Sequence, residues 1–170
     1  TIHGGMAQNL SNSTTSESLR KTLFGESDGL EIGINDGCKE GVAQGRLVGG
    51  NLSLIYSLGG TVYDLNAKNA ILFIEDTGES NYSLDRMLTQ LKLSGKLDML
   101  SGVVVGQFIK MNQGLDKSVM EIIKEKFSDI DIPIMYGVNV GHDQPNNSIC
   151  LGRTVRLTVD DSKASLKYVD

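Results

Sequence analysis

The sequence predicts an α/β fold with a mixed sheet or two small sheets. In the middle of the chain, short apolar segments typical of buried strands alternate with segments of helical periodicity. From residue 148 onward, short β-branched segments are separated by turn residues, which favours antiparallel pairing at the carboxyl-terminal end. A chain of 170 residues that is 39% hydrophobic can bury one sizeable core. We therefore expect a single domain over residues 1–170.

Four segments are predicted to form helices, because apolar residues recur in them at helical spacing and a glycine ends the first three. Thr14 and Glu17 have capping-box spacing at the start of the first segment. Gly49 and Gly50 are expected to form a loop that opens the second. The predicted helices are residues 14–25, 52–59, 83–95 and 116–127. The apolar positions of the first three are Leu19, Leu23 and Phe24, then Leu52, Ile55 and Leu58 on one helical face, and then Leu84, Met87, Leu88 and Leu91. The fourth is expected to bury Val119, Ile122, Ile123 and Phe127.

The remaining apolar segments are predicted to be strands. Residues 35–37, Asn-Asp-Gly, are expected to form a tight turn after the first strand, because these residue types accept a positive φ. Gly152 and residues 160–162 separate the last three strands. The predicted strands are residues 30–34, 70–74, 101–108, 131–138, 148–151, 154–159 and 165–169.

The charge balance and the cysteines limit the class of protein. The chain has 16 Lys+Arg and 21 Asp+Glu without long runs of one sign, and the net charge of -5 argues against a nucleic-acid or anionic-membrane surface. No apolar stretch approaches the ~18 residues of a membrane span. Cys38 and Cys150 lack metal-ligand spacing, so we expect a reducing cytosol, with a single disulfide between them as the alternative. We expect no nucleic acid, no membrane and no cofactor.

Two carboxylates follow one of the predicted buried strands. Residues 71–79 read ILFIEDTGE, so Glu75 and Asp76 come directly after four apolar residues. His142 has a similar position, since it follows an apolar strand and Gly141. Because sites in open α/β sheets form beyond the carboxyl ends of strands, Glu75 and His142 would meet if their strands are neighbours. A carboxylate on one ring nitrogen would fix the tautomer and leave the other nitrogen free to take a nucleophile's proton.

Other interpretations of these residues stay open. Each carboxylate could cap the following helix or remain solvated, and His142 could be a hydrogen-bonded surface residue. Glu75, Asp76, His142 and Asp143 could also form a metal site, although the close spacing typical of His and Cys ligands is absent.

Gly50 and Asn51 are weaker candidates for substrate binding. Backbone N–H groups ahead of a helix could face an anion or an oxyanion, and a plain helix entry is the simpler explanation. His3, near the amino-terminal end, is expected to be structural.

Three long segments also resemble a known family. Residues 40–61 read EGVAQGRLVGGNLSLIYSLGGT, residues 71–108 begin ILFIEDTGESNYSLDR, and residues 138–152 read VNVGHDQPNNSICLG. In order and spacing they resemble the carboxy-terminal domain of the LD-carboxypeptidase family, the serine peptidases of family S66. The resemblance implies a swivelling β/β/α unit beside a flavodoxin-like first domain. It also implies a Ser-Glu-His triad, with Glu75 as the orienter and His142 as general base and then acid.

The resemblance implies that the nucleophile lies on a different domain. The family's serine sits in a Gly-Tyr-Ser-Asp-like turn of the amino-terminal domain, and this chain has no such turn. Its first residues, TIHGGM, resemble the segment just downstream, and the chain begins with Thr1 rather than Met. We therefore expect a two-domain enzyme whose nucleophile-bearing domain is missing here, with exposed apolar surface where that domain docks. The isolated chain would then be inactive.

For the parent protein, the resemblance implies a cytoplasmic serine carboxypeptidase. It would release the terminal D-amino acid from murein tetrapeptide during cell-wall recycling, as a homodimer. Asp76 would be a turn or helix-entry residue. Two alternatives remain: a peptidase of the microcin C immunity type, which hydrolyses a peptidyl-nucleotide, and a catalytically silent binding or dimerisation module.

Overall fold

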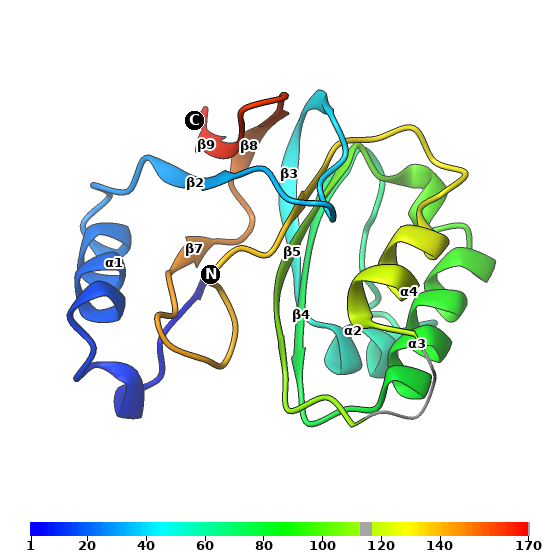
Figure 1. Cartoon of the computed structure of the whole chain (residues 1–170), viewed down its shortest axis with the longest axis horizontal. Coiled ribbons are helices and arrows are strands. Elements are labelled where there is room, and N and C mark those ends of the chain that lie inside the picture. Colours follow the sequence, from blue (N-terminus) through cyan, green and yellow to red (C-terminus); the bar gives the residue numbers. More distant parts are fainter. Residues whose placement is uncertain (113–116, 170) are drawn as a thin grey trace.

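A seven-stranded mixed sheet forms the centre of the molecule (Figure 1). The computed structural model describes residues 1–112 and 117–169. The strands lie in the order β2-β9-β8-β3-β4-β5-β6, and β1 and β7 form a separate two-stranded sheet. The strands are β1 (Ile2–His3), β2 (Gly29–Gly33), β3 (Gly41–Asn51), β4 (Ala70–Thr77), β5 (Gly102–Ile109), β6 (Ile134–Tyr136), β7 (Ile149–Cys150), β8 (Thr154–Val159) and β9 (Lys163–Tyr168).

The large sheet has a parallel part and an antiparallel part. β3, β4, β5 and β6 are parallel neighbours, whereas β8, β9 and β2 are paired antiparallel. The predicted mixed α/β fold with an antiparallel carboxyl-terminal part is confirmed. The turn between β8 and β9 is closed by Asp160, whose carboxylate accepts hydrogen bonds from the backbone N–H groups of Ser162 and Lys163. The predicted strand at 148–151 forms β7, which pairs with β1 instead of this hairpin.

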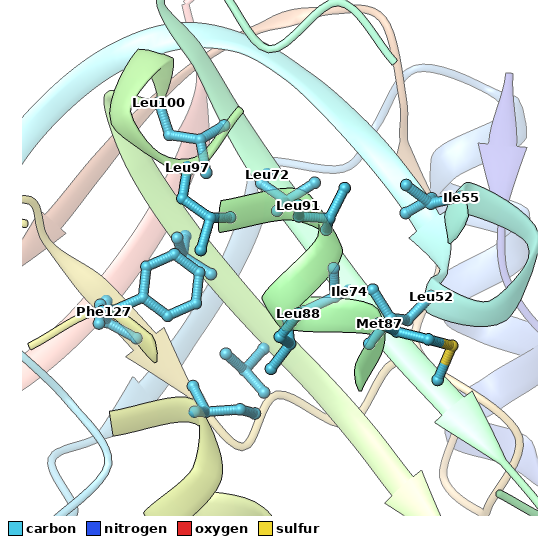
Figure 2. Packing of buried hydrophobic residues seen from close by; sticks show 14 of the residues in the cluster. Leu52, Ile55, Leu72, Ile74, Met87, Leu88, Leu91, Leu97, Leu100 and Phe127 are labelled. Atoms are coloured by element: carbon cyan, nitrogen blue, oxygen red, sulfur yellow. The ribbon is translucent and has the colours of Figure 1, made fainter. Parts of the chain in front are cut away.

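The helices lie on both sides of the sheet (Figure 1). Helices α2 (Leu52–Leu58), α3 (Asn81–Leu93) and α4 (Val119–Lys126) cover one face, and α1 (Ser13–Leu23) lies on the opposite side. Two short 3-10 turns, η1 (Ala7–Asn9) and η2 (Leu97–Met99), complete the elements. Leu88 and Leu91 of α3 pack in one buried cluster with Leu72 and Ile74 of β4 (Figure 2). Each such buried side chain stabilises the fold by about 1.5–3 kcal/mol. Leu23 and Phe24 at the end of the first predicted helix, and Leu58 of α2, are exposed instead.

The opposite face of β4 belongs to a second buried cluster. Ile71 and Phe73 alternate with the helix-facing residues and pack with Val104 of β5 and with Val138 and Val140 of the segment after β6. The central strands are therefore apolar on both faces, as expected for parallel strands covered on both sides.

The sequence missed one strand, β3, and placed the end of β4 too early. The glycine pair Gly49–Gly50, predicted to be a loop, lies inside β3. Gly49 has a φ of 125°, and a Cβ there would lie 1.9 Å from the carbonyl oxygen of Phe73, so only glycine allows this approach between strands. β4 also continues beyond residue 74 and includes Glu75 and Asp76.

The predicted cap of the first helix is also wrong. Asn12 is the N-cap of α1, because its side chain accepts a hydrogen bond from the N–H of Thr15. Glu17 pairs with Arg20 instead. The reason is local: Asn is among the best N-cap residues and lies two positions ahead of Thr14.

The fourth predicted helix begins later than expected. α4 starts after Ser118, which forms a capping box with Glu121. Asp116, which the prediction included, lies outside the described residues.

The segment that follows β6 crosses back over the end of β5. The N–H of Val138 donates to the carbonyl of Val105, and the N–H of Gln107 donates to the carbonyl of Val140. At the carboxyl end of β5, this segment therefore makes the backbone hydrogen bonds that a neighbouring strand would make. The crossing carries the following loop toward β4.

β5 contains one extra residue beside this crossing. Its pairing with β4 steps from Val105 to Phe108 while β4 advances by only two residues, which places a bulge at Gly106 and Gln107. A Cβ on Gly106 would lie 2.3 Å from the carbonyl oxygen of Val140. The crossing therefore requires glycine at this position.

Gly106→Ala should lower the free energy of unfolding by about 1–3 kcal/mol, because the added methyl group displaces a backbone carbonyl rather than a flexible side chain. Gly33→Ala is the matched control, since a Cβ at this β2 position meets nothing within 4 Å. Urea denaturation of both variants measures the difference. Equal effects of the two substitutions would contradict the proposed constraint on the crossing.

Candidate active site

Glu75 and His142 meet at the carboxyl end of β4. The Oε2 atom of Glu75 lies 2.7 Å from Nδ1 of His142. The Glu75 side chain is fully buried, whereas the imidazole keeps 31% of its surface exposed. When Glu75 is ionised it can only accept hydrogen bonds, so the ring then donates Nδ1–H to it. The second ring nitrogen, Nε2, is then left as an acceptor.

The two residues meet although their strands are not neighbours. The sequence left open whether the two strands are neighbours, and β5 lies between β4 and β6. The two residues meet nevertheless, because the segment after β6 crosses over the bulge of β5 before it reaches His142.

The two adjacent carboxylates lie on opposite faces of β4. Glu75 continues the face of Phe73, and Asp76 continues the helix-covered face. Asp76 is 1% exposed and accepts hydrogen bonds from Nδ2 of Asn51 (2.8 Å) and from the N–H of Ser53 (3.0 Å). It is therefore a helix-entry residue of α2, which precedes β4, rather than of the helix that follows.

The two weaker candidates lie beside the pair. The side chain of Asn51 caps α2, because its Oδ1 accepts from the N–H of Leu54 and from the hydroxyl of Ser53. Its amide donates to Asp76, and the same side chain lowers the pKa of the Glu75 carboxyl against the larger rise that burial causes. Gly50 has a φ of 141°, and the space where a Cβ would stand is open. A role for Gly50 or Asn51 in binding substrate stays a prediction.

A hollow of about 400 Å³ opens beside Glu75 and His142. Leu54 and Leu58 of α2 and Leu151 give it an apolar wall. The remaining lining residues are His3, Gly49, Gly50, Asn51 and Ile55. A larger hollow of about 710 Å³ lies between α1 and β2, but neither member of the pair lines it. The smaller hollow is therefore the candidate for substrate binding.

Two side chains that the sequence reasoning missed hold the loop of His142 in place. The side chain of Gln107 accepts a hydrogen bond from the N–H of Asp143 (2.8 Å) and donates one to the carbonyl of Pro145 (3.2 Å). Asn146 is fully buried and bonds through both ends of its amide to the backbone of Gly141. The only sequence signals were a polar residue directly after VVVG and an Asn after Pro.

Burial changes the ionisation of two groups in the site. It raises the pKa of the Glu75 carboxyl above its ordinary value, and the hydrogen bond from His142 opposes this rise. Burial also lowers the pKa of His3, with a further contribution from the positive charge of His142. His3, expected to be structural, has its Nε2 3.9 Å from Oε1 of Glu75.

The structure bears on two alternatives that the sequence left open. Within residues 1–112 and 117–169, no group of three or more His, Cys, Asp or Glu side chains is placed to hold a metal ion. Cys38 and Cys150 are both free thiols, so the alternative of a disulfide between them is not realised.

Among the helices in the described part of the chain, none combines the length and apolar character that crossing a membrane requires.

Asp76→Ala should lower the free energy of unfolding by about 1–3 kcal/mol, because it leaves the amide of Asn51 and the N–H of Ser53 without their acceptor. Asp131→Ala serves as the control, since that side chain is fully exposed and its removal should cost little. Chemical denaturation compares the two variants. If both lose the same small amount of stability, Asp76 does not anchor α2.

Glu75→Gln should become more stable relative to the wild type as the pH rises. Because folding raises the pKa of Glu75, the folded state binds its proton more tightly than the unfolded state above pH 4.5. The wild type therefore loses stability as the pH rises from 4.5 through the raised pKa, and the glutamine variant lacks this loss. Denaturation of both proteins between about pH 4 and about pH 8 measures the difference. A difference that moves in the wild type's favour with rising pH would contradict this assignment.

Comparisons with known proteins identify the family. The model of the LD-carboxypeptidase C-terminal domain matches residues 44–157. The chain is 32% identical over 130 residues to the "Probable murein peptide carboxypeptidase" of Bacillus subtilis, which covers 75% of this chain and 41% of that protein. It is 27% identical over 128 residues to the microcin C7 self-immunity protein MccF of Escherichia coli, covering 74% of this chain and 37% of that protein. The chain spans about half, or less, of the length of the curated relatives it matches.

Solved structures share the fold. The muramoyltetrapeptide carboxypeptidase from Oxalobacter formigenes superposes with a TM-score of 0.84 at 24% identity, covering 99% of this chain and 61% of that chain. MccF in complex with glutamyl sulfamoyl guanosine superposes with a TM-score of 0.79 at 21% identity, covering 100% of this chain and 62% of that chain. At these identities the likeness concerns the fold. The family match over residues 44–157 shows that the chain belongs to the LD-carboxypeptidase family, as its C-terminal domain.

Proposed function

We propose that this chain supplies the Glu and His of a serine-type carboxypeptidase that releases the terminal D-amino acid from murein tetrapeptide. The observation that carries the proposal is the 2.7 Å contact between a fully buried carboxylate and a partly exposed imidazole. The pair opens onto a hollow with an apolar wall. Membership of a carboxypeptidase family supports peptide hydrolysis as the reaction class. The free thiols are compatible with a cytoplasmic enzyme.

The geometry suits general base catalysis by His142. Glu75 accepts Nδ1–H and so keeps the lone pair on Nε2. Nε2 would take the proton of a serine hydroxyl as its oxygen attacks the scissile carbonyl, and would pass that proton to the amine as the C–N bond breaks. Glu75 would stabilise the imidazolium between these steps. A water molecule would then attack the acyl-enzyme with the same proton transfers and regenerate the serine.

The nucleophile would come from outside these 170 residues. The curated relatives are longer, and the chain covers 41% and 54% of two of them. Beside the hollow, α2 and the turn after it expose apolar side chains: Leu54, Leu58, Val62 and Tyr63. Exposed apolar side chains beside a hollow suit the docking of another domain. We propose that the nucleophile-bearing domain docks over this surface and closes the site.

Murein peptide is the first candidate substrate, because relatives in Bacillus subtilis and Oxalobacter formigenes carry that substrate class in their names. A peptidyl-nucleotide is the second candidate. The similarity to MccF, solved with glutamyl sulfamoyl guanosine, favours it. Both substrates would use the same Glu-His pair.

In a full-length protein that includes the nucleophile-bearing domain, His142→Ala should lower kcat/KM for D-alanine release from murein tetrapeptide by about 10⁴–10⁶-fold. Glu75→Gln should lower it by about 10³–10⁴-fold, because the ring loses the acceptor that fixes its tautomer. Asp143→Ala is the matched control: it changes the next residue of the loop and should keep most of the activity. Released D-alanine is measured directly.

The outcomes separate the candidates. Hydrolysis of a peptidyl-nucleotide without hydrolysis of murein tetrapeptide would favour the second substrate. Activity that survives His142→Ala would refute the role of the pair. Absence of hydrolysis with either substrate would leave the silent binding module as the better account.

A further inference from the structure

One of the two buried oxygens of the Glu75 carboxylate lacks a hydrogen bond, although the nearby side-chain amide of Asn51 also lowers the pKa of this carboxyl. Oε2 is bonded to His142, but Oε1 accepts no hydrogen bond from any described residue. A carboxylate can accept several hydrogen bonds, and a buried oxygen without a donor is unfavourable. Nε2 of His3 lies 3.9 Å from Oε1, which is longer than a hydrogen bond but within the distance of an ion pair.

We infer that His3 is a positioning residue of the site, whose Nε2–H closes on Oε1 of Glu75 and thereby holds Oε2 toward His142. The torsion that turns a carboxylate about its last bond is only weakly restricted. One donor therefore does not fix the orientation of Glu75. Two donors, one on each oxygen, do.

The position of His3 is set by two independent contacts. On β1, His3 pairs with Ile149 of β7, the strand that directly follows the loop of His142. Its ring packs edge-on against Phe73, with 5.1 Å between ring centroids and an interplanar angle of 66°. Phe73 lies two residues before Glu75 on the same face of β4. These contacts bring His3, from the start of the sequence, to the same carboxylate that His142 contacts.

A neutral His3 fits this role. The titratable groups near it are Glu75 on β4, His142 in the loop and Cys150 on β7. Burial and the charge of His142 lower the pKa of His3, which keeps its ring uncharged near neutral pH. An uncharged donor on Oε1 leaves the negative charge of Glu75 available to stabilise the imidazolium of His142. That consequence for the reaction rests on the proposed function.

The first test needs no substitution at His3. The chain has only two histidines, so the ¹⁵N ring signals of the wild-type chain can be assigned with the single variant His142→Gln. Nitrogen chemical shifts distinguish the two neutral tautomers. The inference requires the Nε2–H tautomer for His3. A His3 ring protonated on Nδ1 instead would overturn it, because Nε2 could then not donate to Glu75.

The second test compares His3→Phe with His3→Gln. Phenylalanine keeps the aromatic packing on Phe73 but has no N–H, whereas the glutamine amide can still donate to Oε1. In His3→Phe, exchange of the His142 Nδ1 proton with water should accelerate by about tenfold or more, since one hydrogen bond to a charged group is lost. In His3→Gln the rate should stay close to that of the wild type.

Two results would overturn the inference: an unchanged exchange rate in His3→Phe, or equal acceleration in both variants, which would indicate packing alone. Backbone amide spectra check that β1 and β7 remain paired. If His3→Phe does not fold, the tautomer measurement decides. In the full-length enzyme, His3→Phe should lower kcat with little change in KM, and His3→Gln should restore it. Lack of activity in the wild type would refute the proposed function and leave the spectroscopic result for His3 intact.

Discussion

The burial of the Glu75 carboxylate is the constraint on which the rest of the site depends. An ionised carboxylate removed from water costs several kcal/mol unless donors surround it. His142 supplies a donor, and three features deliver it: the bulge at Gly106, the amide of Gln107 and the buried amide of Asn146. None of these belongs to the strand that carries Glu75. The loop, the bulge and the carboxylate therefore form one unit, and a change in any part should alter the position of the imidazole.

The pleat of β4 connects this unit to the core of the domain. Glu75 faces the loop, while Asp76, one residue later, faces the helices and ties down the start of α2. Because α2 also provides the apolar wall of the hollow, β4 positions both the carboxylate of the Glu-His pair and the surface proposed to bind substrate. The orienting carboxylate thus sits on a rigid central strand, and the base sits on a loop that is fixed by hydrogen bonds. Such an arrangement limits the freedom of the pair in the way that catalysis requires.

The sequence predicted the helices and strands better than it predicted the contacts between them. The periodicity of α3 and the turn at residues 160–162 are local signals, and both elements formed as expected. Gly49 predicts a loop because glycine signals a turn, although here it permits close contact between strands. The crossing over Gly106 depends on a tertiary contact that no local pattern encodes. A family resemblance points to Glu75 and His142, whereas His3 and Gln107 have no comparable signal in the sequence.

The central claim is that Glu75 accepts the Nδ1 proton of His142, and proton NMR of the chain tests it most directly. The account predicts a strongly low-field, slowly exchanging imidazole proton in the wild-type chain at neutral pH. The signal should disappear in Glu75→Gln and persist in Asp76→Ala if that variant folds. A low-field signal unchanged by Glu75→Gln, or an imidazole of His142 protonated on Nε2 in the wild type, would contradict the account.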